Sequence, residues 1–134
     1  MKTIPLLIQA LQHATSPKET FRLYKGTDWK EHVSYIHGAK HCYPTVLWKT
    51  HNMELLVMGW CKDQTYRTYT NYNVIYSHIL EGSLFSKESE ADHRHKMLFL
   101  QTHSWHTIMP FSIVDMKAPM QSASLHLFHY SYFK

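Results

Sequence analysis

A serine and a histidine near the C-terminal end of the chain are spaced so that they could act together. Ser124, His126 and Phe128 alternate with Leu125 and Leu127. Successive side chains of a β-strand point to opposite faces, so the hydroxyl and the imidazole would share one face, backed by leucines on the other. The pair could relay a hydrogen bond to a bound ligand, or the two groups could satisfy each other. Both interpretations stay open, whereas no acid is placed to orient the imidazole for nucleophilic catalysis.

Other histidines raise the question of a metal. His106 could be a metal ligand, but one imidazole cannot hold a catalytic metal alone, since such sites normally use three protein ligands. We therefore favour a hydrogen-bonded imidazole inside a pocket. His93 and His95 form the chain's only His-x-His, and Glu90 or Asp92 could join them in a displaced metal site. Their charged surroundings without a strand pattern favour a solvated loop.

The elements that would position these residues begin with helices. Apolar residues at helical spacing predict a first helix from Ile4 to His13. Ser16 and Glu19 form a capping-box pattern with Pro17 between them, which predicts a second helix that ends near Gly26. A weaker signal of the same kind predicts a short third helix over residues 28–36.

Beyond Gly38 the pattern changes to short strands. The charged stretch from Ser86 to His95 is predicted to be a loop. Short strands behind two or three helices indicate a mainly β protein, a jelly-roll barrel with a helical N-terminal cap. We predict a single domain over residues 1–134, with the cap at 1–37 and the barrel at 38–134. The predicted strands are Met53–Trp60, Val74–Leu80, Lys96–Gln101, Thr107–Val114 and Ala123–Tyr130.

Composition narrows the class of protein. Aromatic residues make up 14% and charged residues only 18%, which favours an ordered β-rich chain. The net charge of +4 comes from scattered basic residues, so a nucleic-acid partner is disfavoured. Cys42 and Cys61 lack CxxC spacing, which argues against a cysteine zinc site and for a reduced, cytoplasmic protein. The apolar N-terminal run is interpreted as a helix rather than a signal peptide, and no segment is long enough to span a membrane.

Three stretches, in this order, resemble the cysteine dioxygenase family, iron enzymes of the cupin fold. Leu55–Trp60 is similar to the apolar strand that ends in Trp before the family's metal-binding strand. His78–Leu84 is similar to its "leucine, acid or amide, Gly, x, Leu" turn. Trp105–Ile108 followed by Ser124–Phe128 resembles the strand of the third metal ligand and then the Ser-x-His-x-Tyr strand. The resemblance covers the chain from about Trp29 onward and implies a cupin barrel.

The family's two other iron ligands, a His-x-His pair, are missing. Depending on the direction of counting, their positions are occupied by Tyr69 and Asn71 or by Thr68 and Thr70. Neutral threonine and asparagine oxygens are weak ligands for iron(II), which favours imidazole and carboxylate. Of the three ligands that the resemblance implies, only His106 remains.

Further positions depart from the family. The tyrosine that can cross-link to a cysteine falls at Phe128, that cysteine falls near Ile75, and the arginine that binds the substrate carboxylate falls at Thr45. Arg67 could take over an anionic ligand and Tyr69 could close the pocket, although an exposed edge strand is the favoured interpretation of this segment. The pocket residues that we predict are Tyr43, Trp60, Arg67, Tyr69 and Phe128, beside Ser124 and His126 as candidate catalytic residues.

Three functions follow as hypotheses. The first is a cupin-fold relative of cysteine dioxygenase that has lost its iron site, needs no cofactor and binds a small polar molecule, with exposed strand edges that would permit a homodimer. The second is an active iron-dependent thiol dioxygenase rebuilt from His106, Tyr69 and one further group. The third is a basic module that binds nucleic acid by aromatic stacking.

Overall fold

The computed structural model describes residues 29–49, 51, 53–71, 73–90 and 95–130. Contacts divide the chain into two compact units, residues 1–33 and 34–134. In the first unit the described part contains one 3-10 turn, η1 (Trp29–His32). The helix predicted over residues 28–36 is thus wrong in length, and the two predicted helices before it lie outside the described residues. The cap boundary at residue 37 stays a prediction.

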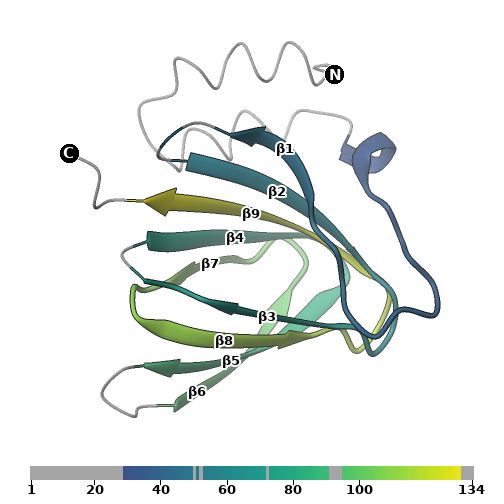
Figure 1. Ribbon diagram of the computed structural model, residues 1–134. Helices are drawn as coiled ribbons and strands as arrows, with labels where there is room; N and C mark the ends of the chain where they lie inside the picture. The colour runs from purple at the N-terminus through teal and green to yellow at the C-terminus, as the bar shows by residue number, and fades with distance from the viewer. Residues whose placement is uncertain (1–28, 50, 52, 72, 91–94, 131–134) are drawn as a thin grey trace. The chain divides into compact units, whose positions relative to one another are not determined.

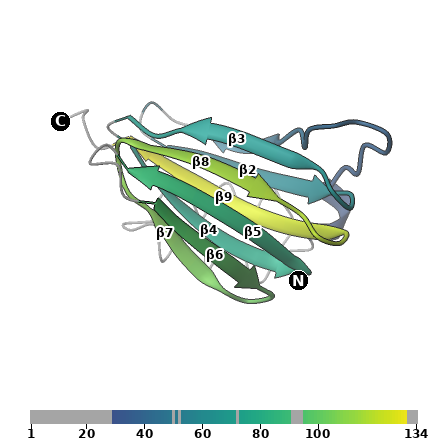
Figure 2. The same cartoon turned by 90° about the horizontal axis from the view of Figure 1, so that it is seen from below.

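The second unit consists of two antiparallel sheets that face each other (Figures 1 and 2). In the described part of the chain they contain nine strands, all in antiparallel pairs. In spatial order the first sheet holds β1 (Thr45–Lys49), β2 (Met53–Trp60), β9 (Ser122–Tyr130), β4 (Asn73–Glu81) and β7 (Trp105–Ile108). The second holds β3 (Thr65–Tyr69), β8 (Ser112–Lys117), β5 (Ser83–Glu90) and β6 (His95–Gln101).

The core lies between the two sheets. Side chains on β8 alternate strictly between buried and exposed, as expected where only one face of a strand meets the core. The adjacent central strands β2 and β9 are buried on both faces for most of their length. This is why the sequence of β2 reads as a nearly continuous apolar run, whereas β9 also buries polar side chains, Ser124 and His126 among them. The main buried cluster includes Leu56, Met58, Trp60, Ile75, Ile79, Leu84, Ile108, Val114, Met116 and Phe128.

Most predicted strands are confirmed. Met53–Trp60 matches β2 at both ends, and the predictions at 74–80, 96–101 and 123–130 match β4, β6 and β9 to within one residue at each end. The predicted strand Thr107–Val114 is wrong, because the chain turns between β7 and β8. Phe111 has a φ of 60° in that turn. Thr70 Oγ1 holds the turn by donating to Met109 O at 2.8 Å and accepting from Ser112 N at 2.8 Å.

The predicted loop from Ser86 to His95 is also wrong. Residues 86–90 belong to β5, and His95 is the first residue of β6. Ser86 and Glu88 are buried whereas Lys87 is exposed, so the segment does alternate with period 2. Its inward side chains are polar, and that is why no apolar pattern marked it as a strand.

The tight turn between β4 and β5 depends on Gly82, which has a φ of 80°. A Cβ at this position would lie 2.3 Å from Ser122 Oγ and 2.8 Å from Gln121 O. Ser122 Oγ cannot move away freely, since it donates to Ser83 O at 2.9 Å and accepts from Ser83 N at 3.1 Å. The glycine is therefore required for both its backbone angle and the space it leaves.

We predict that Gly82→Ala lowers the free energy of unfolding by about 3 kcal/mol, because left-handed strain and a steric clash add. Gly38 is the matched control: its φ is 82°, but nothing lies within 4 Å of a Cβ built there. Gly38→Ala should lower the free energy of unfolding by only about 1 kcal/mol. Urea unfolding of both variants measures the difference, and equal losses would contradict the assigned clash.

Candidate functional site

A row of polar side chains crosses the interior face of the first sheet. The strand register places Ser77 on β4 directly opposite His126 on β9 and directly opposite His106 on β7. Side chains at such opposite positions lie on the same face of a sheet, with Cβ atoms roughly 5 Å apart. Two imidazoles therefore flank one serine hydroxyl on the face of the sheet that meets the core.

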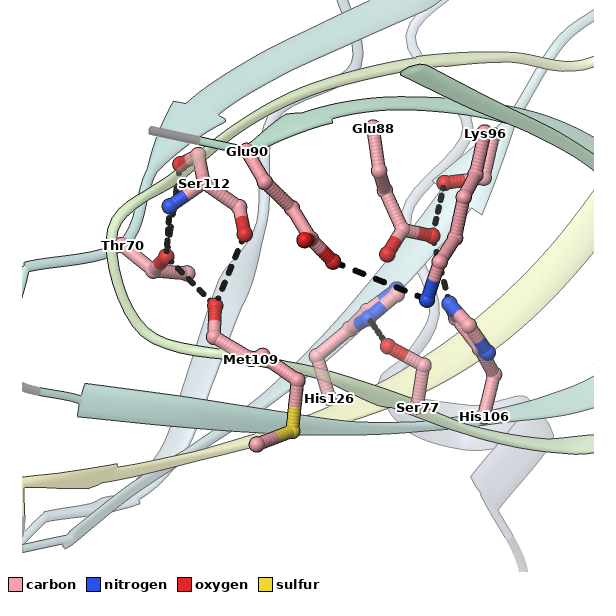
Figure 3. Close-up of polar contacts among 10 residues, drawn as sticks. Thr70, Ser77, Glu88, Glu90, Lys96, His106, Met109, Ser112 and His126 are labelled. Atoms are coloured by element: carbon pink, nitrogen blue, oxygen red, sulfur yellow. Dashed lines mark hydrogen bonds and ion pairs between the residues drawn. The ribbon is translucent and has the colours of Figure 1, made fainter. Parts of the chain in front are cut away.

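On one side of this row, the predicted pair Ser124 and His126 lies in a buried hydrogen-bond chain. Trp60 Nε1 donates to Ser124 Oγ at 2.8 Å, and Ser124 Oγ lies 2.7 Å from His126 Nε2. On the other side of the ring, His126 Nδ1 lies 2.8 Å from Ser77 Oγ (Figure 3). A neutral imidazole has one donor and one acceptor nitrogen, so both ring nitrogens are satisfied in either tautomer.

Burial holds the His126 imidazole in its neutral form. Its pKa is lowered to about 3, because desolvation disfavours the charged ring. Both serine hydroxyls can donate or accept, and no carboxylate contributes to the shift. At neutral pH this ring is a hydrogen-bonding group without charge, and it cannot act as a general acid near pH 7.

His106 contacts a residue from the facing sheet. Its Nε2 donates to Oε2 of Glu88 on β5 at 2.5 Å (Figure 3). Ser86 Oγ donates to the same oxygen at 3.3 Å. The Glu88 side chain is 4% exposed and the His106 side chain 17%. Among the described residues, Glu88 Oε1 accepts no hydrogen bond. A deeply buried carboxylate thus keeps one unused acceptor beside an imidazole that solvent can reach.

The residues at the implied iron-ligand positions do not fit iron(II). Thr70 is buried and its hydroxyl is occupied by backbone groups of the β7–β8 turn. Tyr69 is 59% exposed, and Asn71 is exposed as well. His106 is the one imidazole left, and its Nε2 is bonded to Glu88. Across the part of the chain that the structure describes, no three His, Cys, Asp or Glu side chains are grouped so that they could hold a metal ion.

The other predicted pocket residues divide between core and surface. Trp60 and Phe128 are buried in the core. Tyr43 is 57% exposed, and Arg67 forms an exposed ion pair with Asp115 at 3.5 Å. The structure therefore does not bring Tyr43, Arg67 or Tyr69 together with His106 and His126. β3 is an edge strand, as the favoured interpretation of this segment had it.

The candidate His-x-His site falls partly outside the described residues, so it stays a prediction. His93 and Asp92 lie outside them. His95 is exposed on β6, where its Nδ1 lies 3.0 Å from Ser89 Oγ. Glu90 forms an ion pair with Lys96 at 3.6 Å (Figure 3).

Two residues of the buried group were missed from the sequence. Ser77 was placed in a predicted strand, but the register that pairs it with His106 and His126 links segments far apart in the chain. Glu88 falls in the predicted loop, because the inward residues of this segment are polar and the sequence shows no apolar alternation there. That Glu88 meets His106 could not be derived from spacing, because the two strands belong to different sheets.

Comparisons with known proteins identify the fold. No protein-family model and no curated protein sequence matches the chain. A double-stranded beta-helix protein from Klebsiella pneumoniae superposes with a TM-score of 0.65 at 10% identity, over 75% of this chain and 85% of its own. The described part of the chain contains no helix with the length and apolar character needed to cross a membrane.

Two solved structures named as cupins match as well. The cupin domain of Cnp3 from Schizosaccharomyces pombe gives a TM-score of 0.59 at 9% identity, over 68% of this chain and 66% of its own. An RmlC-like cupin from Shewanella frigidimarina gives a TM-score of 0.55 at 13% identity, over 72% of this chain and 82% of its own. Such identities establish the architecture alone, and on that evidence this chain has the cupin fold.

Proposed function

We propose that the protein is a relative of the cysteine dioxygenases that has lost thiol oxidation and binds a small polar molecule at the Glu88–His106 pair. The observation that carries the proposal is the unused Oε1 of Glu88, on a side chain only 4% exposed. Burying a carboxylate with an unsatisfied oxygen costs free energy, and a ligand that donates a hydrogen bond would offset this cost.

The chemistry of the pair defines the ligand class. Glu88 Oε1 requires a donor, which an amine or a hydroxyl supplies. The partial exposure of His106 gives such a molecule an approach to the pair. Ser77 lies opposite His106 in the strand register, and His126 is neutral, so both add polar groups to the site without adding charge. We therefore expect a small amine, amino alcohol or polyol rather than an anion.

The residues at the three implied iron-ligand positions support the loss of thiol oxidation. Iron(II) dioxygenases use imidazole and carboxylate ligands with open positions. Here two of the three implied positions carry residues whose oxygens are weak ligands, and the third is a histidine bonded to Glu88. The rebuilt site with Tyr69 has no support in the geometry, since that side chain is 59% exposed on an edge strand.

We predict that ligand-observed NMR with a panel of small amines, amino alcohols and sugars detects binding to the full chain. Glu88→Gln should weaken that binding at least tenfold, since the amide replaces one acceptor oxygen by a donor. Glu54→Gln is the matched control, because Glu54 pairs with the exposed Lys49 and lies away from the pair. Absence of binding by every compound, or equal binding by Glu88→Gln, would contradict the proposal.

Metal analysis and oxygen uptake test the loss of oxidation separately. Freshly purified protein should hold far less than one iron per chain, and His106→Ala should leave the metal content unchanged. Cysteine should cause no oxygen uptake above a protein-free control. Near-stoichiometric iron together with cysteine-dependent oxygen uptake would instead establish the active dioxygenase.

A further inference from the structure

The outer strand of the second sheet carries an apolar surface. β6 has a single neighbour, β5, among the described strands, and lies at the edge of its sheet (Figure 1). Met97 on this strand is 77% exposed and Phe99 is 49% exposed. Phe85 on β5, opposite Phe99, is 45% exposed, and the two rings lie 4.9 Å apart. We call these three side chains together the β6 patch.

The other edge of the same sheet has a different character. β3 has five residues, and its outward Arg67 pairs with Asp115. Short length and charged side chains are how proteins protect an open edge from pairing with another chain. β6 has seven residues, and the patch side chains Met97 and Phe99 line its outer face. The edge at β6 carries one charged side chain, Lys96, beside two exposed apolar ones, and it is the longer of the two edges.

The sequence of β6 is compatible with pairing to itself. In an antiparallel pair centred on Leu98, Met97 of one copy lies opposite Phe99 of the other, and Lys96 lies opposite Leu100. No two like charges face each other in this register. A methionine beside an aromatic ring is a favourable cross-strand contact.

We propose that two copies of this chain associate through antiparallel pairing of their β6 strands around Leu98, with the β6 patches in contact on the outer face. Both edge backbones gain hydrogen-bond partners, and three exposed apolar side chains per copy leave water. The surface is small, so we expect a dimer in the micromolar range. This proposal does not depend on the ligand site, because its residues point away from the core.

Sedimentation velocity of the full chain over a range of concentrations tests the proposal. We expect reversible dimerisation, and Met97→Glu should raise the dissociation constant at least tenfold. The new carboxylate is tolerated in the monomer, since Lys87 lies opposite residue 97 on β5. Met120→Glu is the matched control: that methionine is 51% exposed outside the patch, and its variant should dimerise like the wild type. A chain that stays monomeric, or a dimer that Met97→Glu leaves unchanged, would overturn the proposal.

The register has a direct test. Met97→Cys and Phe99→Cys, each made in a Cys61→Ser background to remove the native accessible thiol, are mixed and oxidised. Because residues 97 and 99 face each other in the proposed pair, the mixed covalent dimer should form in preference to either homodimer, and its mass identifies it. Preference for the homodimers, or no covalent dimer, would rule out pairing around Leu98.

Discussion

Replacing His106 with leucine is expected to destabilise the fold by roughly 3 kcal/mol, because the change leaves the Glu88 carboxylate buried without its main partner. Ser86 would remain as its only donor among the described residues, at 3.3 Å. Breaking a buried hydrogen-bonded pair from one side costs more than the pair itself is worth, since the remaining carboxylate keeps its desolvation penalty. Urea unfolding at pH 7 measures the loss.

The double variant Glu88→Leu/His106→Leu should recover most of that loss. It removes both polar groups together, and apolar replacement of a buried pair is often neutral or stabilising. The double-mutant cycle is therefore expected to be strongly non-additive. The exposed pair Arg67–Asp115, with atoms 3.5 Å apart, is the control, and its cycle should give less than about 1 kcal/mol. Additive losses at Glu88 and His106 would mean that the two side chains do not interact as the structure places them.

The double variant Glu88→Leu/His106→Leu, if it regains the stability of the wild type, also tests the proposed binding function. If it folds as well as the wild type, the Glu88–His106 pair is not needed for the stability of the barrel. A folded chain without the pair should then fail to bind the amines or polyols that the wild type binds. This outcome would separate a binding role of the pair from a structural one.

The sequence was most informative where one physical pattern dominated a segment. Met53–Trp60 was predicted with correct bounds because a central strand that is buried on both faces reads as a continuous apolar run. Ser124 and His126 were correctly expected to share a face, since alternation along a strand is independent of its neighbours. Both predictions rest on local spacing alone.

The missed features depend on long-range register or on a polar interior. The predicted loop takes in residues 86–90 of β5 because the inward side chains there, Ser86 and Glu88, are polar and form no hydrophobic pattern. The contact between Glu88 and His106 joins strands of two different sheets, and strand pairing is set by the whole fold rather than by spacing. The turn that separates β7 from β8 interrupts an apolar run that reads as one strand.

The stability of the protein is expected to fall on acidification because of His126. Its pKa is about 3 in the folded state, against an ordinary value of 6.5. Below pH 6.5 the unfolded chain binds a proton on this residue that the folded chain does not bind. The free energy of unfolding therefore decreases as pH falls from 6.5 toward 3, by about 1.4 kcal/mol per pH unit for this group alone. Above pH 6.5 both states are neutral at this residue, and the contribution to the slope vanishes.

His126→Gln isolates this contribution, since glutamine is polar and does not titrate. The variant should be less stable at pH 7, because it cannot reproduce both contacts of the ring with Ser77 and Ser124. Between pH 6.5 and 4.5 the wild type should lose about 2 to 3 kcal/mol more than the variant, so the two stability curves converge. His41→Gln, at an exposed position, should keep the wild-type slope. Parallel curves for wild type and His126→Gln would mean that this imidazole is protonated in the folded protein, and the buried neutral ring with its two serine partners would have to be abandoned.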